Sequence, residues 1–223
     1  MGTVSADGAR PVTTTEGAAR GGPVTPELRV CVVGDDLVAG VGDPRSLGWV
    51  GRVGARTART EGAVTLFPLG VPGETTAGLL ARWREETGRR FAGAGPASFR
   101  LVVGLGHADL DEGLSLARSR LNLANVLDEC GARDLPVFVV GPPPTSGPDR
   151  TALVAELSDA FADVCIRRAV PYVDCWAPLV QHEDWLTDLA AGDGRHPGQV
   201  GYGLMAWLVL HNGWARWLGV ADD

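Results

Sequence analysis

Five short apolar runs constrain the fold of this chain more than any other feature. They are rich in Val, Leu and Phe, each ends at Gly or Asp, and they cover residues 28–34, 63–70, 98–104, 135–141 and 171–174. Segments with a helical spacing of apolar residues separate them, and such an alternation of strands and helices requires a parallel sheet covered by helices on both faces. We therefore expect an α/β fold, a three-layer α/β/α sandwich with a five-stranded parallel sheet.

The helices of this sandwich are indicated by apolar residues that recur on one face. Thr75 or Thr76 can cap the helix in which Leu79, Leu80 and Trp83 follow a helical period. The other expected helices cover residues 48–59, 114–130 and 149–168, with a last one from about residue 198 through Trp214. Residues 176–196 are expected to form a loop.

The chain of 223 residues is long enough for one domain of ordinary size and a tail. Residues 1–27 are rich in Gly, Ala, Thr and Pro and show no apolar period. This composition predicts a disordered N-terminal arm followed by a single domain over residues 28–223.

Charge and composition exclude several classes of protein. The net charge is −7 and no basic cluster is present, which argues against nucleic acid or an anionic membrane surface as a partner. No apolar run has the length of a membrane span, and the N-terminus lacks the apolar region of a secretory signal. The four cysteines lack metal-binding spacing and suggest reduced core thiols. We expect a cytoplasmic protein that acts on a small molecule without a cofactor or metal; its oligomeric state is not indicated.

Polar residues follow the predicted strands at the edge where ligands bind to open α/β sheets. They are Asp35 and Asp36 after the first strand, Gly73 and Glu74 after the second, His107 and Asp109 after the third, residues of the loop after Gly141 at the end of the fourth, and Asp174 after the fifth, with Asp193 and His196 before the last helix. Because several strand ends contribute, this edge is the candidate site.

The residues alone leave more than one chemistry open at that edge. The loop after the first strand is not G-x-G-x-x-G and no P-loop lysine follows it, which disfavours a nucleotide site. Asp35, Asp36 and Asp109 could hold Mg²⁺ through carboxylates, a weak indication because acidic residues also suit helix N-termini. Asp193 lies three residues before His196 and could orient its imidazole, although a turn aspartate and a helix-start histidine would look the same.

Four blocks in the chain resemble those of the SGNH hydrolases, the GDSL-type esterases and lipases, over about residues 28–218. The blocks are Gly34-Asp35-Asp36-Leu37 with Val38-Ala39-Gly40 for G-D-S-L-x-x-G, Gly70-Val71-Pro72-Gly73-Glu74-Thr75 for G-x-x-G-E/D-T, Gly106-His107-Ala108-Asp109 for G-x-N-D, and Asp193-Gly194-Arg195-His196-Pro197 for D-G-x-H-P. The resemblance implies a flavodoxin-like SGNH hydrolase fold with a Ser-His-Asp site.

Two positions depart from the family pattern. Asp36 stands where the family has its nucleophilic serine, and Ala108 stands where it has the asparagine that donates to the oxyanion. The Gly73 N–H, which resembles a second oxyanion donor, and the Asp193–His196 pair are retained. Asp36 has no hydroxyl for a histidine base to deprotonate, so this variant triad is not expected to perform ordinary serine acyl transfer.

Three interpretations of Asp36 follow. An aspartate nucleophile could open an epoxide or displace a halide, after which His196, oriented by Asp193, would activate water. Asp36 and His196 could instead form an acid/base pair for a biosynthetic cyclisation, elimination or isomerisation. In the third interpretation the chain is a catalytically degenerate relative that binds a ligand or partner. Some weak residual ester hydrolysis is also compatible with the sequence.

Other residues are candidates for oxyanion or substrate contacts. Besides Gly73, Ala108 and Asp109, they include His107, which could replace the missing asparagine as a donor or be a surface histidine. Trp176 and Trp185 are candidates for a pocket wall or lid. The resemblance further predicts a pocket at the carboxyl-terminal edge of the sheet, in which an Asp36 carboxylate oxygen lies within hydrogen-bond or one-water reach of a His196 ring nitrogen.

Overall fold

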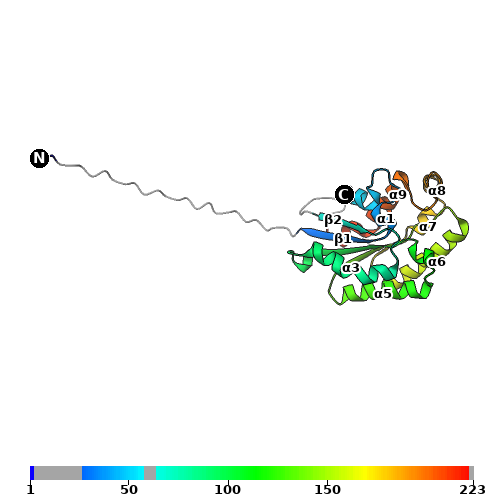
Figure 1. The fold of residues 1–223 in the computed structure, drawn as a ribbon, viewed down its shortest axis with the longest axis horizontal. Coiled ribbons are helices and arrows are strands. Elements are labelled where there is room, and N and C mark those ends of the chain that lie inside the picture. Colours follow the sequence, from blue (N-terminus) through cyan, green and yellow to red (C-terminus); the bar gives the residue numbers. More distant parts are fainter. Residues whose placement is uncertain (3–26, 58–63, 221–223) are drawn as a thin grey trace.

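A computed structural model describes residues 1–2, 27–57 and 64–220 of the chain. Most of the predicted N-terminal arm, together with the end of the first predicted long helix, lies outside these residues. The described part forms the expected three layers, with a sheet between two groups of helices (Figure 1).

The sheet contains five parallel strands in the order β2-β1-β3-β4-β5. They are β1 Leu28–Gly34, β2 Val64–Gly70, β3 Phe99–Gly104, β4 Val137–Val140 and β5 Tyr172–Val173. The five-stranded parallel sheet predicted from the apolar runs is therefore confirmed. Strands β3, β4 and β5 are each somewhat shorter than the apolar run that predicted them. Because all strands run in one direction, the loops after them meet at a single edge.

Alternate residues of β1 face two separate cores. Val30 and Val32 pack in one core and Cys31 and Val33 in the other, and each of the four is fully buried. Burying a side chain of this size contributes about 1.5–3 kcal/mol. This two-sided burial explains why the strand is a continuous apolar run and not an alternating one.

Each face of the sheet is covered by its own helices (Figure 1). On one face lie α3 Thr76–Phe91, α5 Leu116–Gly131 and α6 Pro148–Ile166; on the other lie α1 Asp36–Ala39, α2 Gly48–Arg56, α7 Trp176–Leu179, α8 Glu183–Ala190, α9 Gln199–Val209 and α10 Ala215–Leu218. The short helix α4 Ala108–Asp111, the 3₁₀ helix η1 Pro96–Ser98 and the π-helical segment η2 Leu210–Trp214 complete the elements of the described residues. No helix among the described residues is both long and apolar enough to span a bilayer.

Two sequence expectations differ from the structure. The expected loop over residues 176–196 contains α7 and α8, which bury Leu179, Trp185 and Leu189. The last helix is interrupted at Gly213, whose φ of 89° is outside the right-handed helical region.

Glycines at the ends of three neighbouring strands allow close packing at the carboxyl edge of the sheet. Gly34 is in register with both Gly70 and Gly104. A Cβ atom on Gly34 would lie 1.8 Å from the Gly104 carbonyl oxygen, and one on Gly70 would lie 2.3 Å from the Ala39 nitrogen. Without side chains here, α1 can start directly after β1 and place Asp36 at the carboxyl ends of the strands.

Candidate active site

Asp36 is the first residue of α1 and its carboxylate binds the turn after β2. Its Oδ2 atom accepts a hydrogen bond of 2.8 Å from the Gly73 N–H. Gly73 has a φ of 74°, in the left-handed region that favours glycine. The turn thereby directs a backbone donor toward the carboxylate.

His196 faces the second oxygen of the same carboxylate. Its Nε2 atom lies 3.6 Å from Asp36 Oδ1, with the two side chains 15% and 20% exposed. This separation is too long for a good hydrogen bond but short enough for an ion pair or a bridging water. The structure therefore places Asp36 and His196 together, as the sequence predicts.

Asp193 fixes the orientation of the imidazole. The His196 Nδ1–H donates to Asp193 Oδ2 over 2.6 Å, and the backbone N–H groups of Arg195 and His196 both donate to Oδ1 over 2.8 Å. Burial disfavours the charged carboxylate, but these hydrogen bonds and the imidazole outweigh it and hold the pKa of Asp193 below its usual range. The ionised carboxylate keeps the proton on Nδ1 and leaves Nε2 facing Asp36.

Asp35 has a different environment from its neighbour. It is 1% exposed, and its two oxygens accept from Leu37 N at 3.1 Å and from Gly106 N at 2.7 Å. Burial raises its pKa to about 7, although the two backbone hydrogen bonds oppose the shift. Asp35 thus caps α1 and connects it to the loop after β3.

Asp109 and Glu74 also bind groups of the fold. Asp109 accepts from the backbone N–H of Thr76 at 2.6 Å and from its hydroxyl at 2.7 Å. Glu74 pairs with Arg82 at 2.5 Å, and burial raises the pKa of this carboxyl. Among the described residues no three acidic, histidine or cysteine side chains gather in a way that could hold a metal ion.

His107 and Ala108 lie at the start of α4 and are both buried. The His107 Nε2–H donates to the Pro143 carbonyl at 2.9 Å, so only Nδ1 remains for another partner. Burial, more than the nearby arginines, lowers the pKa of His107 to about 4, and the ring is therefore neutral near pH 7. His107 is thus not the surface histidine considered above.

The two tryptophans proposed for a pocket wall or lid differ. Trp176 donates from Nε1 to the Thr151 carbonyl at 3.1 Å and lines a cavity of about 570 Å³ between α6, α7 and α8. Trp185 is fully buried and donates to the Pro144 carbonyl at 3.2 Å. The lid interpretation of Trp185 is therefore wrong, because its ring is part of the core under α9.

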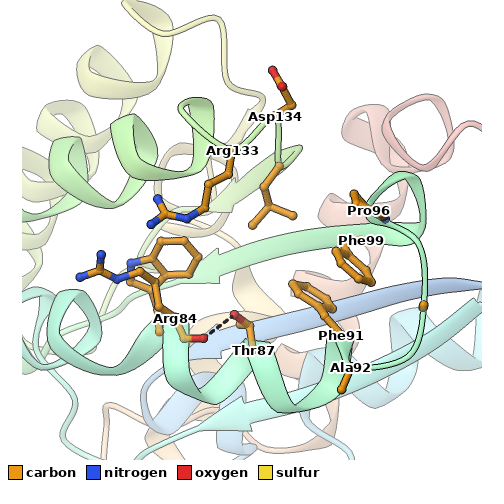
Figure 2. Close-up of a pocket in the computed structure, with 12 residues that line it drawn as sticks. Arg84, Thr87, Phe91, Ala92, Pro96, Phe99, Arg133 and Asp134 are labelled. Carbon is orange, nitrogen blue, oxygen red and sulfur yellow. Dashed lines mark hydrogen bonds between the residues drawn. The ribbon is translucent and has the colours of Figure 1, made fainter.

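Another cavity, of about 670 Å³, lies at the opposite edge of the sheet. Figure 2 shows the stacked rings of Phe91 and Phe99 on one side of it and Arg133 on the other. Phe99 begins β3, so this cavity lies at the amino ends of the strands. It is distant along the strands from Asp36 and is not part of the candidate site.

A family model described as the GDSL-like Lipase/Acylhydrolase family matches residues 32–204. The chain belongs to this family. The match includes all four sequence blocks, and the five-stranded parallel sheet is the fold expected of it.

Solved structures are similar to this GDSL-like family member over most of their length. The lipase/acylhydrolase from Enterococcus faecalis is 25% identical, with a TM-score of 0.70 over 88% of this chain and 98% of the other. The acetylxylan esterase Axe2 from Geobacillus stearothermophilus is 15% identical, with a TM-score of 0.68 over 90% and 99%. The psychrotrophic esterase EstA from Pseudoalteromonas sp. is 18% identical, with a TM-score of 0.65 over 86% and 98%. No curated protein matches the sequence.

Two groups that position the Asp193–His196 segment of this GDSL-like chain were not apparent from its sequence. Asp188 accepts from the backbone N–H groups of Gly198 and Gly201 at 2.6 and 2.9 Å and so fixes the start of α9. The Ser146 N–H donates to the Gly194 carbonyl at 2.9 Å. Neither contact has a sequence signal, because each joins residues in separate elements without a recurring motif.

Proposed function

We propose that this GDSL-like family member hydrolyses a small organic molecule by attack of Asp36 on an sp³ carbon, as in the opening of an epoxide. The contact between Asp36 Oδ2 and the Gly73 N–H carries this proposal. It leaves Oδ1 as the attacking atom, on the side where His196 Nε2 lies 3.6 Å away. Membership of a family of lipases and acylhydrolases supports hydrolysis as the class of reaction.

In the first step Oδ1 forms a bond to a ring carbon and the carbon–oxygen bond of the epoxide breaks. The alkoxide takes a proton from His196, or from solvent water where the imidazole has been removed, so the product of this step is an ester between Asp36 and the opened substrate. A carboxylate is a suitable nucleophile for such a displacement. No acyl oxyanion forms here, which is compatible with alanine at position 108.

In the second step water gives a proton to the neutral His196 and attacks Cγ of the ester. The negative charge develops on Oδ2, which already accepts from Gly73 N at 2.8 Å. A backbone donor aligned with the developing charge in advance is the usual means of stabilising such an intermediate, at about 10²–10³ in rate per donor. Collapse expels Oδ1 with the diol, the leaving oxygen takes a proton from His196, and the carboxyl proton then returns to the histidine.

A second candidate is acid/base catalysis of a cyclisation, elimination or isomerisation. The 3.6 Å approach of an imidazole and a carboxylate, both partly exposed, favours it because the pair could transfer protons without a covalent step. The two candidates differ in whether Oδ1 leaves with the product.

The test is turnover of a panel of small epoxides and p-nitrophenyl esters by the wild type, Asp36→Asn and His196→Ala. We expect epoxide turnover that both variants lose, and an ester adduct on the Asp36 peptide of His196→Ala by mass spectrometry. A single turnover in H₂¹⁸O should give unlabelled diol and label in Asp36. Asp159→Asn on the exposed face of α6 is the matched control.

If the diol from the single turnover carries ¹⁸O and no ester adduct forms on Asp36, water attacks the substrate directly. That result would reject Asp36 as the nucleophile and favour the acid/base mechanism. No turnover on the whole panel, with all variants folded, would contradict both mechanisms and favour a degenerate binding protein.

A further inference from the structure

Two arginines share one carboxylate next to the candidate active site. Arg150 Nη2 lies 2.6 Å from Asp111 Oδ1, and Arg195 Nη2 lies 2.5 Å from Asp111 Oδ2. Arg150 Nη2 also donates to the His107 carbonyl at 3.2 Å. The three charged side chains are each about one-third exposed and therefore accessible to a small ligand.

This arginine pair joins the segment after β3 to the segment that carries His196. Asp111 ends α4, the helical turn that starts with Ala108, and residues three apart on a helix lie on the same face. Arg195 immediately precedes His196, and the backbone N–H groups of both bind Asp193. The pair is thus attached directly to the residues that hold the imidazole.

The pair carries one more positive charge than Asp111 neutralises, in a chain with a net charge of −7. The Nε atoms of both Arg150 and Arg195 are shielded from solvent and have no hydrogen-bond partner among the described residues. Unpaired buried donors are uncommon in folded proteins and point to a missing partner. The positive charge of the pair also acts on His107, whose pKa is lowered mainly by burial and further by these two arginines.

We propose that Arg150 and Arg195 bind a carboxylate on the substrate, so that the substrate class is small acids that carry the reacting carbon, such as epoxy acids. Guanidinium groups match a carboxylate with paired hydrogen bonds. One surplus positive charge balances one carboxylate, whereas a phosphate dianion would remain only half neutralised. The choice of substrate rests on the proposed function, but the binding site itself does not.

The test compares trans-3-phenylglycidate with its uncharged amide, which differs only in the acidic group. Binding is measured by calorimetry on Asp36→Asn, so that the result is independent of turnover. We expect the acid to bind at least about tenfold more tightly than the amide, an effect of roughly 1.4 kcal/mol. Arg150→Gln and Arg195→Gln should each remove most of this preference.

Two further variants separate a ligand site from a structural ion cluster. Asp111→Asn frees both arginines and should tighten acid binding, whereas weaker binding would indicate that the three side chains only hold the fold. Arg120→Gln alters a similar cluster, in which Arg120 and Arg167 share Asp163, and should leave the preference unchanged.

Equal affinity for acid and amide, or no binding of either compound, overturns the carboxylate site. If the wild type binds the acid selectively but turns over no epoxide, the carboxylate site is supported and Asp36 is rejected as the nucleophile.

Discussion

Asp36 carries its oxygen atoms one bond further from the backbone than a serine would at the same turn. This extra length is what allows Oδ2 to reach the Gly73 N–H at 2.8 Å while Oδ1 remains near His196. On the proposed mechanism, the backbone donor that would bind the substrate's oxyanion in a serine enzyme, here the Gly73 N–H, binds the Asp36 carboxylate instead. The same residue thus explains why ester hydrolysis is not expected of the wild type.

Restoring the family residues at two positions should create an ordinary esterase. We expect Asp36→Ser with Ala108→Asn to hydrolyse p-nitrophenyl acetate about 10²–10³ times faster than Asp36→Ser alone, because the asparagine restores the side-chain donor that joins the backbone donors to the oxyanion. Steady-state kinetics measure the gain, and adding His196→Ala should abolish it. Equal rates for the single and double variants would mean that position 108 does not face the oxyanion.

At the scale of elements, the blocks that form the site are held by long-range hydrogen bonds to helix ends. Asp109 follows β3, yet it binds the first residue of α3, and Asn122 of α5 donates to the same Thr76 hydroxyl at 3.0 Å. The Asp109 carboxylate therefore joins three elements of the fold, α4, α3 and α5, through hydrogen bonds.

Removing this carboxylate should reduce stability more than activity per folded molecule. Asp109→Ala leaves the buried Thr76 N–H without a partner, which costs about 1–3 kcal/mol of unfolding free energy. Urea denaturation measures the loss, and Asp159→Ala, on an exposed surface, should change it by less than about 0.5 kcal/mol. A stability loss no larger than that of the control would contradict the anchoring role.

The elements could be predicted to different degrees. Apolar runs identified all five strands, since burial on both faces leaves a continuous apolar signal. The helices α7 and α8 could not be predicted, because four and eight residues are too few to show a clear period. The Asp36–His196–Asp193 arrangement was predictable from strand ends and family blocks, whereas the pairing of Asp111 with Arg195 joins positions 84 residues apart without a motif.

At the scale of the whole molecule, the buried Asp35 couples folding to pH. Its pKa is raised to about 7 in the folded protein, so the folded state retains a proton that the unfolded chain releases near its ordinary value of 3.8. The folded state is therefore favoured most below the unfolded pKa, and this contribution is lost as the pH rises through about 7.

We expect the stability of the wild type relative to Asp35→Asn to fall as the pH rises from about 4 to about 7. The slope should approach, at most, about 1.4 kcal/mol per pH unit, since asparagine does not titrate. Urea denaturation across this range measures the difference, with Asp159→Asn as the control for an exposed carboxyl. A difference that stays constant with pH would show that Asp35 is ionised in the folded protein throughout.

The hydrogen bond between Asp36 and the Gly73 N–H has a practical consequence for how such a protein is detected. Fluorophosphonate reagents reveal serine hydrolases by capturing their hydroxyl group, with the phosphoryl oxygen bound by the same backbone donors that bind an oxyanion. Here position 36 has no hydroxyl, and the Gly73 donor is already occupied by the protein's own side chain. A labelling survey of active serine hydrolases would therefore pass over this protein, whereas, on the proposed mechanism, reagents that alkylate carboxylates would find it.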